Sequence, residues 1–179
     1  MDGGTHDVLA FWRDAGYRKW FGGGAAFDAQ CRDRFLEAHH AAARREFEHW
    51  MDSADGALAL VLLLDQIPRN IFRGSAHAYA TDPLARHYAA HALEAGFDAQ
   101  VDPQLRLFLY MPFEHSEDPA DQERAVELFT VLGDAATLKY ALAHRDVIAR
   151  FGRFPHRNHA LGRRNTVEEQ AWLDAGGGF

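Results

Sequence analysis

Helix-boundary signals limit what this chain can fold into more than any other feature of its sequence. Asp–Pro occurs three times, at Asp82–Pro83, Asp102–Pro103 and Asp118–Pro119. An Asp side chain accepts hydrogen bonds from the free N–H groups at a helix start, and proline at the first helical position sacrifices no bond. Thr166 and Glu169 have the spacing of a capping box. No segment alternates long enough for a strand, so the chain is predicted to be all-α.

Between these signals, the spacing of apolar residues predicts roughly eight helices. The segment Ala57–Ile67 is apolar nearly all round and is therefore expected at the centre of the core. Short connections favour antiparallel neighbours, which gives an eight-helix antiparallel array. The expected helices cover residues 7–15, 28–51, 57–67, 83–95, 103–111, 119–132, 135–151 and 167–175.

The size of the chain fits one helical domain over residues 1–179, with loose ends at 1–6 and 176–179. A formal net charge of -7 argues against nucleic-acid binding across the surface. The longest apolar run, Ala57–Leu64, is too short to span a bilayer, so no membrane partner is expected. A single cysteine, Cys31, excludes an internal disulfide and fits a reducing compartment. A cytoplasmic location is therefore expected.

Three polar segments carry the residues that invite a functional interpretation. The first motif is Asp65–Gly74, the second is Tyr110–Gln122 and the third is Phe151–Arg164. Each mixes charged residues with aromatics and proline, and each follows an expected apolar helix. In an up-down array those three helices point the same way, so the three motifs are expected to meet at one end of the bundle.

The residue types in the motifs suit an anionic small molecule. Arginine presents a rigid fork that fits phosphate or carboxylate, and amides can orient a ligand. Histidine and a neighbouring carboxylate supply acid/base chemistry near neutral pH, so Glu114, His115 and His156 are candidates for catalysis. The candidate ligand-binding residues are Arg69, Asn70, Arg73, Glu117, Arg153, Arg157, Asn158 and Arg163.

A second interpretation uses the same residues without a small-molecule ligand. Arginines near helix C-termini satisfy free carbonyl groups, and arginine–carboxylate pairs can hold loops on the core. The protein is then a non-enzymatic helical scaffold that binds a protein segment, and its motifs are structural locks. The sequence leaves open whether a reaction is catalysed and whether a cofactor is bound.

No metal is assigned from the sequence. His39 and His40 are adjacent, so they are expected to face different sides of a helix. No H-E-x-x-H pattern is present. Glu114 and His115, followed by Glu117 and Asp118, offer ligand types for a divalent ion but lack a specific spacing.

Several long segments, in the same order, resemble the bacterial "domain of unknown function 924" family. They are FWRDAGYRKWF (residues 11–21), LDQIPRNIFRG (64–74), LYMPFEHSEDPADQ (109–122), RFGRFPHRNHALGR (150–163) and the final T-x-x-E. The resemblance spans residues 11–179 and implies an all-α, TPR-like array of antiparallel helix pairs. It implies no activity, substrate or catalytic residue. The chain itself shows no plain 34-residue TPR repeat.

Overall fold

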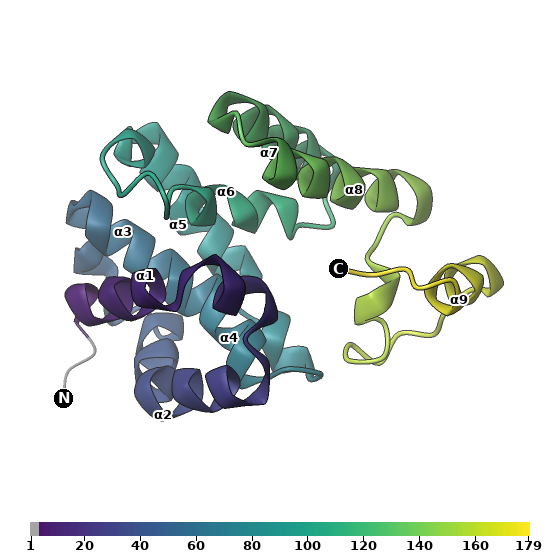
Figure 1. Cartoon of the computed structure of the whole chain (residues 1–179), viewed down its shortest axis with the longest axis horizontal. Helices are drawn as coiled ribbons and strands as arrows, with labels where there is room; N and C mark the ends of the chain where they lie inside the picture. Colours follow the sequence, from purple (N-terminus) through teal and green to yellow (C-terminus); the bar gives the residue numbers. More distant parts are fainter. Residues whose placement is uncertain (1–3) are drawn as a thin grey trace. The chain divides into compact units, whose positions relative to one another are not determined.

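A computed structural model describes residues 4–179, and across those residues it contains helices and turns but no strand (Figure 1). The all-α fold class is therefore confirmed. The described residues group into two compact units. Unit 1 comprises the chain through Arg73 together with His77–Pro112, and unit 2 comprises Gly74–Ala76 and Phe113–Phe179. Organisation as one domain stays a prediction. In the part of the chain that is described, no helix is long and apolar enough to cross a membrane.

The core of unit 1 is one continuous helical run. It consists of α3 (Ala54–Val61), the π-helix η2 (Leu62–Gln66) and α4 (Ile67–Ile71). The backbone stays right-handed helical where these elements join, so they form a single rod. Every side chain from Ala57 to Leu64 is fully buried, as is Ile67. The expected central position of this helix is confirmed, because a segment that is apolar all round must be covered on every side.

Three longer helices surround that rod in unit 1: α1 (Thr5–Gly22), α2 (Gly24–Ala43) and α5 (Asp82–Glu94). α1 changes direction at Gly16, whose φ of 69° is readily adopted by glycine. α6 (Leu107–Glu114) carries the chain from unit 1 into unit 2. Short 3₁₀ turns complete the connections: η1 (Glu48–Asp52), η3 (Ala76–Tyr79) and η4 (Phe97–Ala99).

Unit 2 is built on an α-helical hairpin. α7 (Pro119–Leu132) and α8 (Ala135–Phe151) lie side by side and antiparallel (Figure 1). Gly133 closes α7 in the left-handed conformation, and Asp134 accepts a 2.8 Å hydrogen bond from the Thr137 N–H at the start of α8. η5 (Pro155–Arg157) and α9 (Val167–Asp174) follow. A small apolar core joins them: Val147, Ile148 and Phe154, with Phe151 and Trp172 at its edge.

Several helix bounds differ from the sequence expectation; α1, expected over residues 7–15, continues past the kink at Gly16 to Gly22. The helix expected over residues 28–51 ends at Ala43, because Arg45 adopts a left-handed φ of 65° and the chain then enters η1. The helix expected over residues 103–111 begins at Leu107 instead. The Asp102 side chain accepts a hydrogen bond from the Gln104 N–H and so stabilises a turn ahead of α6 instead of capping the helix.

The helix-start signals have different fates. Asp118 caps α7 through a 2.8 Å bond from the Ala120 N–H, and Thr166 with Glu169 forms the predicted capping box. Asp82 lies inside α5, whose cap position is Thr81, and its carboxylate pairs with Arg69. At the termini, residues 1–3 lie outside the described residues, and 5–6 already belong to α1. Residues 176–179 follow α9 without helical structure.

Candidate functional site

The second and third motifs meet in unit 2 through a two-point pair between Glu117 and Arg163. Arg163 Nη1 and Nη2 lie 2.8 and 2.9 Å from the two Glu117 carboxylate oxygens. The Phe154 N–H donates to Glu117 at 2.8 Å, and Arg163 donates to the Phe154 carbonyl oxygen at 3.1 Å. Partial burial acts to raise the pKa of Glu117, but the bonds from Arg163 and Phe154 outweigh it and lower that pKa. Glu117 is therefore a charged anchor for the loop that carries Phe154.

A second two-point pair in unit 2 joins Arg153 to Glu169. Arg153 Nε and Nη2 lie 2.6 and 2.8 Å from the Glu169 oxygens. Glu169 also accepts a 2.7 Å hydrogen bond from the Thr166 N–H as part of the capping box. The Arg153 hydrogen bonds, followed by the Thr166 N–H, lower the pKa of Glu169 to about 2. The Glu169 carboxylate thus binds Arg153 of the third motif and also caps the start of α9.

Asn158 connects these two pairs. Its side chain is fully buried. Its amide oxygen accepts a 2.8 Å hydrogen bond from Arg163 Nε. Its amide nitrogen donates to Asn165 at 2.8 Å and to Glu169 at 3.4 Å. Asn158 is thus a link inside the protein and is not turned toward solvent.

A buried polar cluster in unit 2 contains the predicted catalytic candidates. Glu114 and Arg157 are almost fully buried, and His115 and His156 are half-buried. Arg157 donates to the His115 carbonyl oxygen at 3.0 Å, and its guanidinium lies 4.4 Å from the centre of the Phe154 ring. The structure thus brings Glu114, His115, His156 and Arg157 together in unit 2.

His144 belongs to the same cluster. Its Nδ1 donates to the Tyr140 carbonyl oxygen at 2.9 Å and also lies 3.2 Å from Glu114 Oε1. Burial, and then the charge of His115, lower the pKa of His144 to about 3. The contact between His144 and Glu114 is therefore one with a neutral ring, even though its distance is that of an ion pair. The Phe179 ring stacks on His144 with 3.6 Å between ring centres.

The first motif forms its own pairs in unit 1. Arg69 holds both Asp82 oxygens at 2.8 and 2.9 Å and lies 3.2 Å from the fully buried Asp65. Burial opposes the charge of Arg69, but Asp65 and Asp82 outweigh it and raise the pKa of Arg69. Arg73 holds both oxygens of Asp28 at 2.7 and 2.8 Å. Each guanidinium fork therefore already faces a carboxylate of its own unit.

The predicted site residues thus fall into two groups. Arg153, Arg157, Asn158, Arg163, Glu117 and the three catalytic candidates come together in unit 2. Arg69, Asn70 and Arg73 lie in unit 1, where Asn70 donates to the Gln66 carbonyl oxygen at 3.1 Å. Convergence of all three motifs at one site stays a prediction.

The sequence interpretation missed several partners of these motifs. Asp28 is the carboxylate that holds Arg73, although it lies 45 residues away. Gln122 is fully buried and donates to the carbonyl oxygens of Glu114 and Ser116 at 2.7 and 2.6 Å. A glutamine four residues into a helix carries no signal that would distinguish it from a surface residue.

A histidine cluster in unit 1 was also missed. His39, His40 and His77 offer ligand atoms that all lie within 4.8 Å of one another. His39 and His40 were expected to face different sides of a helix and so not to share a site, but their rings lie close together. Their ring centres lie 5.2 Å apart, because both side chains lean toward the turn that carries His77.

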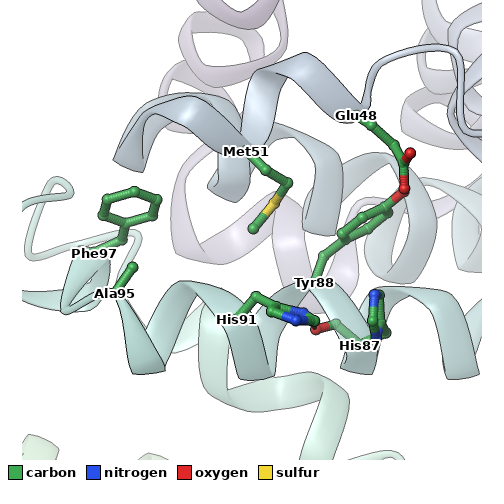
Figure 2. A pocket seen from close by; sticks show the side chains of 7 residues that line it. All are labelled: Glu48, Met51, His87, Tyr88, His91, Ala95 and Phe97. Atoms are coloured by element: carbon green, nitrogen blue, oxygen red, sulfur yellow. Dashed lines mark hydrogen bonds between the residues drawn. The ribbon is translucent and has the colours of Figure 1, made fainter.

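Unit 1 also has an open groove between η1 and α5, with a volume of about 410 Å³ (Figure 2). Met51, Tyr88, Ala95 and Phe97 give it an apolar lining, and Figure 2 shows the Met51 side chain directed into it. At its edge the Tyr88 hydroxyl donates to Glu48 at 3.1 Å. None of the predicted site residues lines this groove.

The fold and these paired motifs define an all-helical protein with arginine–carboxylate pairs in each unit. The chain belongs to a family described as bacterial protein of unknown function (DUF924), whose model matches residues 8–177. It is similar to a solved structure of a protein of unknown function, ATU0120 from Agrobacterium tumefaciens. The two are 52% identical over 96% of this chain and 97% of that chain, with a TM-score of 0.92. No curated protein matches the chain.

Proposed function

We propose that this protein is a non-enzymatic helical interaction scaffold, TPR-like in its use of antiparallel helix pairs, and that its three motifs are structural locks. The observation that carries the proposal is the two-point pairing of four motif arginines with carboxylates of their own unit. These arginine locks are Arg69–Asp82, Arg73–Asp28, Arg153–Glu169 and Arg163–Glu117.

The pairing disfavours an external anion for an energetic reason. Two parallel N–H···O bonds occupy the face of the guanidinium that would grip a phosphate or a carboxylate ligand. An incoming anion must therefore separate the arginine from its partner and leave a shielded acid without its cation. For Arg69 and Asp82, the most shielded of these pairs, removing one partner costs about 3–5 kcal/mol. An arginine that is already bound to a carboxylate of the protein is accordingly a poor anion site.

The groove of unit 1 is the surface on which we place the partner of the scaffold. Its apolar lining and its volume of about 410 Å³ suit a bulky apolar side chain from a protein segment. Met51 adds adaptability, since methionine fits irregular apolar shapes. We further propose a cytoplasmic location, supported by the single cysteine, Cys31, which is buried and free.

A second candidate function is a site for an anionic small molecule in unit 2. The observation that favours it is the burial of Arg157 beside His115, His144 and His156, a combination that ligand sites use. In this version Arg157 grips the anion, and Glu114, His115 and His156 remain the candidates for catalysis.

Thermal melts of Arg157→Ala separate the two candidates. If Arg157 serves the fold as the four locks do, through its bond to the His115 carbonyl oxygen, the melting temperature of Arg157→Ala falls by several degrees. Inorganic phosphate then stabilises neither the parent protein nor the variant. The comparison needs sodium chloride at matched ionic strength. Arg164→Ala is the matched control, because Arg164 lies in the same motif but is exposed. A parent protein that phosphate stabilises, with an Arg157→Ala variant that melts normally but does not respond, would favour the small-molecule site instead.

The groove is tested with a library of random peptides displayed on phage. Peptides that bind the parent protein but not Met51→Glu, and that carry a large apolar residue, are expected. His159→Ala, a change at an exposed residue of unit 2, should leave peptide binding intact. No enrichment on the parent protein, or equal binding to Met51→Glu, would remove the groove as the partner surface.

A further inference from the structure

The geometry points to a binding site for a divalent transition-metal ion, formed by His39 and His40 of α2 and His77 of η3. The ring nitrogens of these three residues lie within 4.8 Å of one another, although His77 is far from the other two in sequence. Three convergent imidazoles are the ligand set of many zinc sites. This inference goes beyond the proposed scaffold and does not depend on it.

His39 is oriented as a metal ligand by its backbone partner. Its Nδ1 lies 2.8 Å from the carbonyl oxygen of Leu63, which has no hydrogen to share, so Nδ1 carries the proton. The lone pair is therefore on Nε2, the atom that faces His77. A ring N–H held by a backbone carbonyl is the usual outer-shell support of a histidine ligand. Leu63 itself lies in the π-helix η2, and such irregular turns recur at functional sites.

The spacing between His39 and His77 matches that of two ligands on one ion. Their Nε2 atoms lie 3.2 Å apart. Two nitrogens bound at 2.0–2.1 Å to a tetrahedral zinc ion are about 3.3 Å apart. In the ion-free protein one proton bridges the two rings, and an ion at this point would take the place of that proton. The two nitrogens then keep the spacing that they already have, and each ring turns to aim its lone pair at the ion.

The third ligand and the surroundings fit the same ion. The His40 ring centre lies 5.2 Å from that of His39 and 5.6 Å from that of His77. His40 is half-buried and His77 is exposed, so an ion can enter from solvent and the two rings can turn toward it. Phe72 stacks on His77 at 3.9 Å between ring centres and gives the cluster an apolar wall.

The chemistry of the cluster selects the class of ion. The ligand set offered by the cluster is three imidazole rings, which bind metal in their neutral form. Neutral imidazoles suit zinc, nickel, cobalt and copper and do not suit magnesium or calcium, which require oxygen ligands. Three nitrogens also leave a coordination position for water or for a further ligand.

The test uses the full chain without a histidine tag, stripped of metal with EDTA and dialysed. Isothermal titration with zinc chloride should give one equivalent of tight binding, and cobalt should give the intense visible bands of a four- or five-coordinate ion. His77→Ala and His40→Ala should each weaken zinc binding by at least about 10–100-fold, the loss typical of outer-shell changes alone. His77 is exposed, so its removal leaves the fold intact.

His87 and His91 supply the matched control. They are one helical turn apart in α5, with ring centres 4.3 Å apart, and are therefore a rival two-ligand site. The double variant His87→Ala/His91→Ala should keep the zinc affinity and the cobalt spectrum of the parent protein. The inference is overturned if the parent binds no zinc, if His77→Ala binds as the parent does, or if the His87/His91 variant is the one that loses binding.

Discussion

The third motif and the histidine cluster of unit 1 make opposite use of polar residues. Sequence reasoning placed ligand binding in the third motif because it is rich in arginine, and it set aside His39 and His40 because they are adjacent. In the structure, Arg153 and Arg163 each face a carboxylate with two hydrogen bonds. The nitrogens of His39 and His77 face each other instead.

The difference teaches that a polar group's suitability for ligand binding depends less on its residue type than on whether it already has a partner within the protein. A charge that already holds its counter-charge stabilises the protein and gains little from an external ligand. Three neighbouring imidazoles gain from an ion, because a metal accepts a lone pair from each ring, whereas a bridging proton joins only two of them. Losing a lock should therefore lower the stability of the fold, whereas losing a ring of the cluster should lower mainly metal binding.

The largest effect is expected from Arg69→Ala. This change removes the cation that faces two carboxylates, of which Asp65 is fully buried. The free energy of unfolding in urea should fall by about 3–5 kcal/mol. Arg69→Lys should lie between the parent and Arg69→Ala, because it keeps the charge but loses the two-point fork. Arg124→Ala, which breaks an exposed pair with Glu127, is the control and should cost under about 1 kcal/mol. Equal losses from Arg69→Ala and Arg124→Ala would contradict the lock.

An intermediate effect is expected from pH through His144. Its pKa is about 3 in the folded protein against a usual 6.5. The unfolded chain therefore binds more protons between these values, and stability is lost as the pH falls from 6.5 toward 3. Between about pH 6.5 and 4.5 this one group should remove roughly 2 kcal/mol of stability. The charged and titratable groups around it are Glu114, His115, His156 and Arg157.

The measurement is urea unfolding of the parent protein and of His144→Gln across that pH range. The variant lacks the titrating ring, so its stability should fall less steeply as acid is added. Parallel pH profiles for the two proteins would mean that His144 is not held neutral by burial.

The smallest effect is expected from His77→Ala in metal-free protein. His77 is exposed, and its removal leaves the His39 bond to Leu63 in place. The change also removes the hydrogen-bond partner of His39 Nε2, so stability should fall by about 1 kcal/mol, the net contribution of one hydrogen bond. With excess zinc chloride, the parent should gain melting temperature and His77→Ala should not. A large loss of stability in metal-free His77→Ala would make the cluster structural, like the locks.

The sequence predicted those parts of the fold that local rules determine. The all-α class, the buried Ala57–Ile67 segment, the Asp118 cap and the Thr166–Glu169 capping box follow from spacing and from the chemistry of helix ends. Thr81 is at the cap position of α5 in place of Asp82, whose carboxylate pairs with a non-local competitor for hydrogen bonds, Arg69. Local patterns carry no information about such a competitor.

The candidate site was predicted only in part for the same reason. All three motifs were expected to meet at one site, and Glu117 with Arg163 does join the second and the third. The partner Asp28 and the approach of His77 to His39 depend on contacts between residues 45 and 38 positions apart, respectively. Adjacency in sequence also misled the interpretation of His39 and His40, since two neighbouring side chains can lean toward a third residue beside the helix.

A double-mutant cycle on Glu117 and Arg163 tests the central claim, that the motif arginines serve the fold, most directly. The free energy of unfolding is measured for the parent protein, Glu117→Gln, Arg163→Ala and the double variant. Each single change should be costly because it leaves a partly buried partner without its counter-charge, so the double variant should lose less than the sum. A coupling of about 1–3 kcal/mol is expected. Additive losses within about 0.5 kcal/mol would show that the pair is not a lock and would contradict the account.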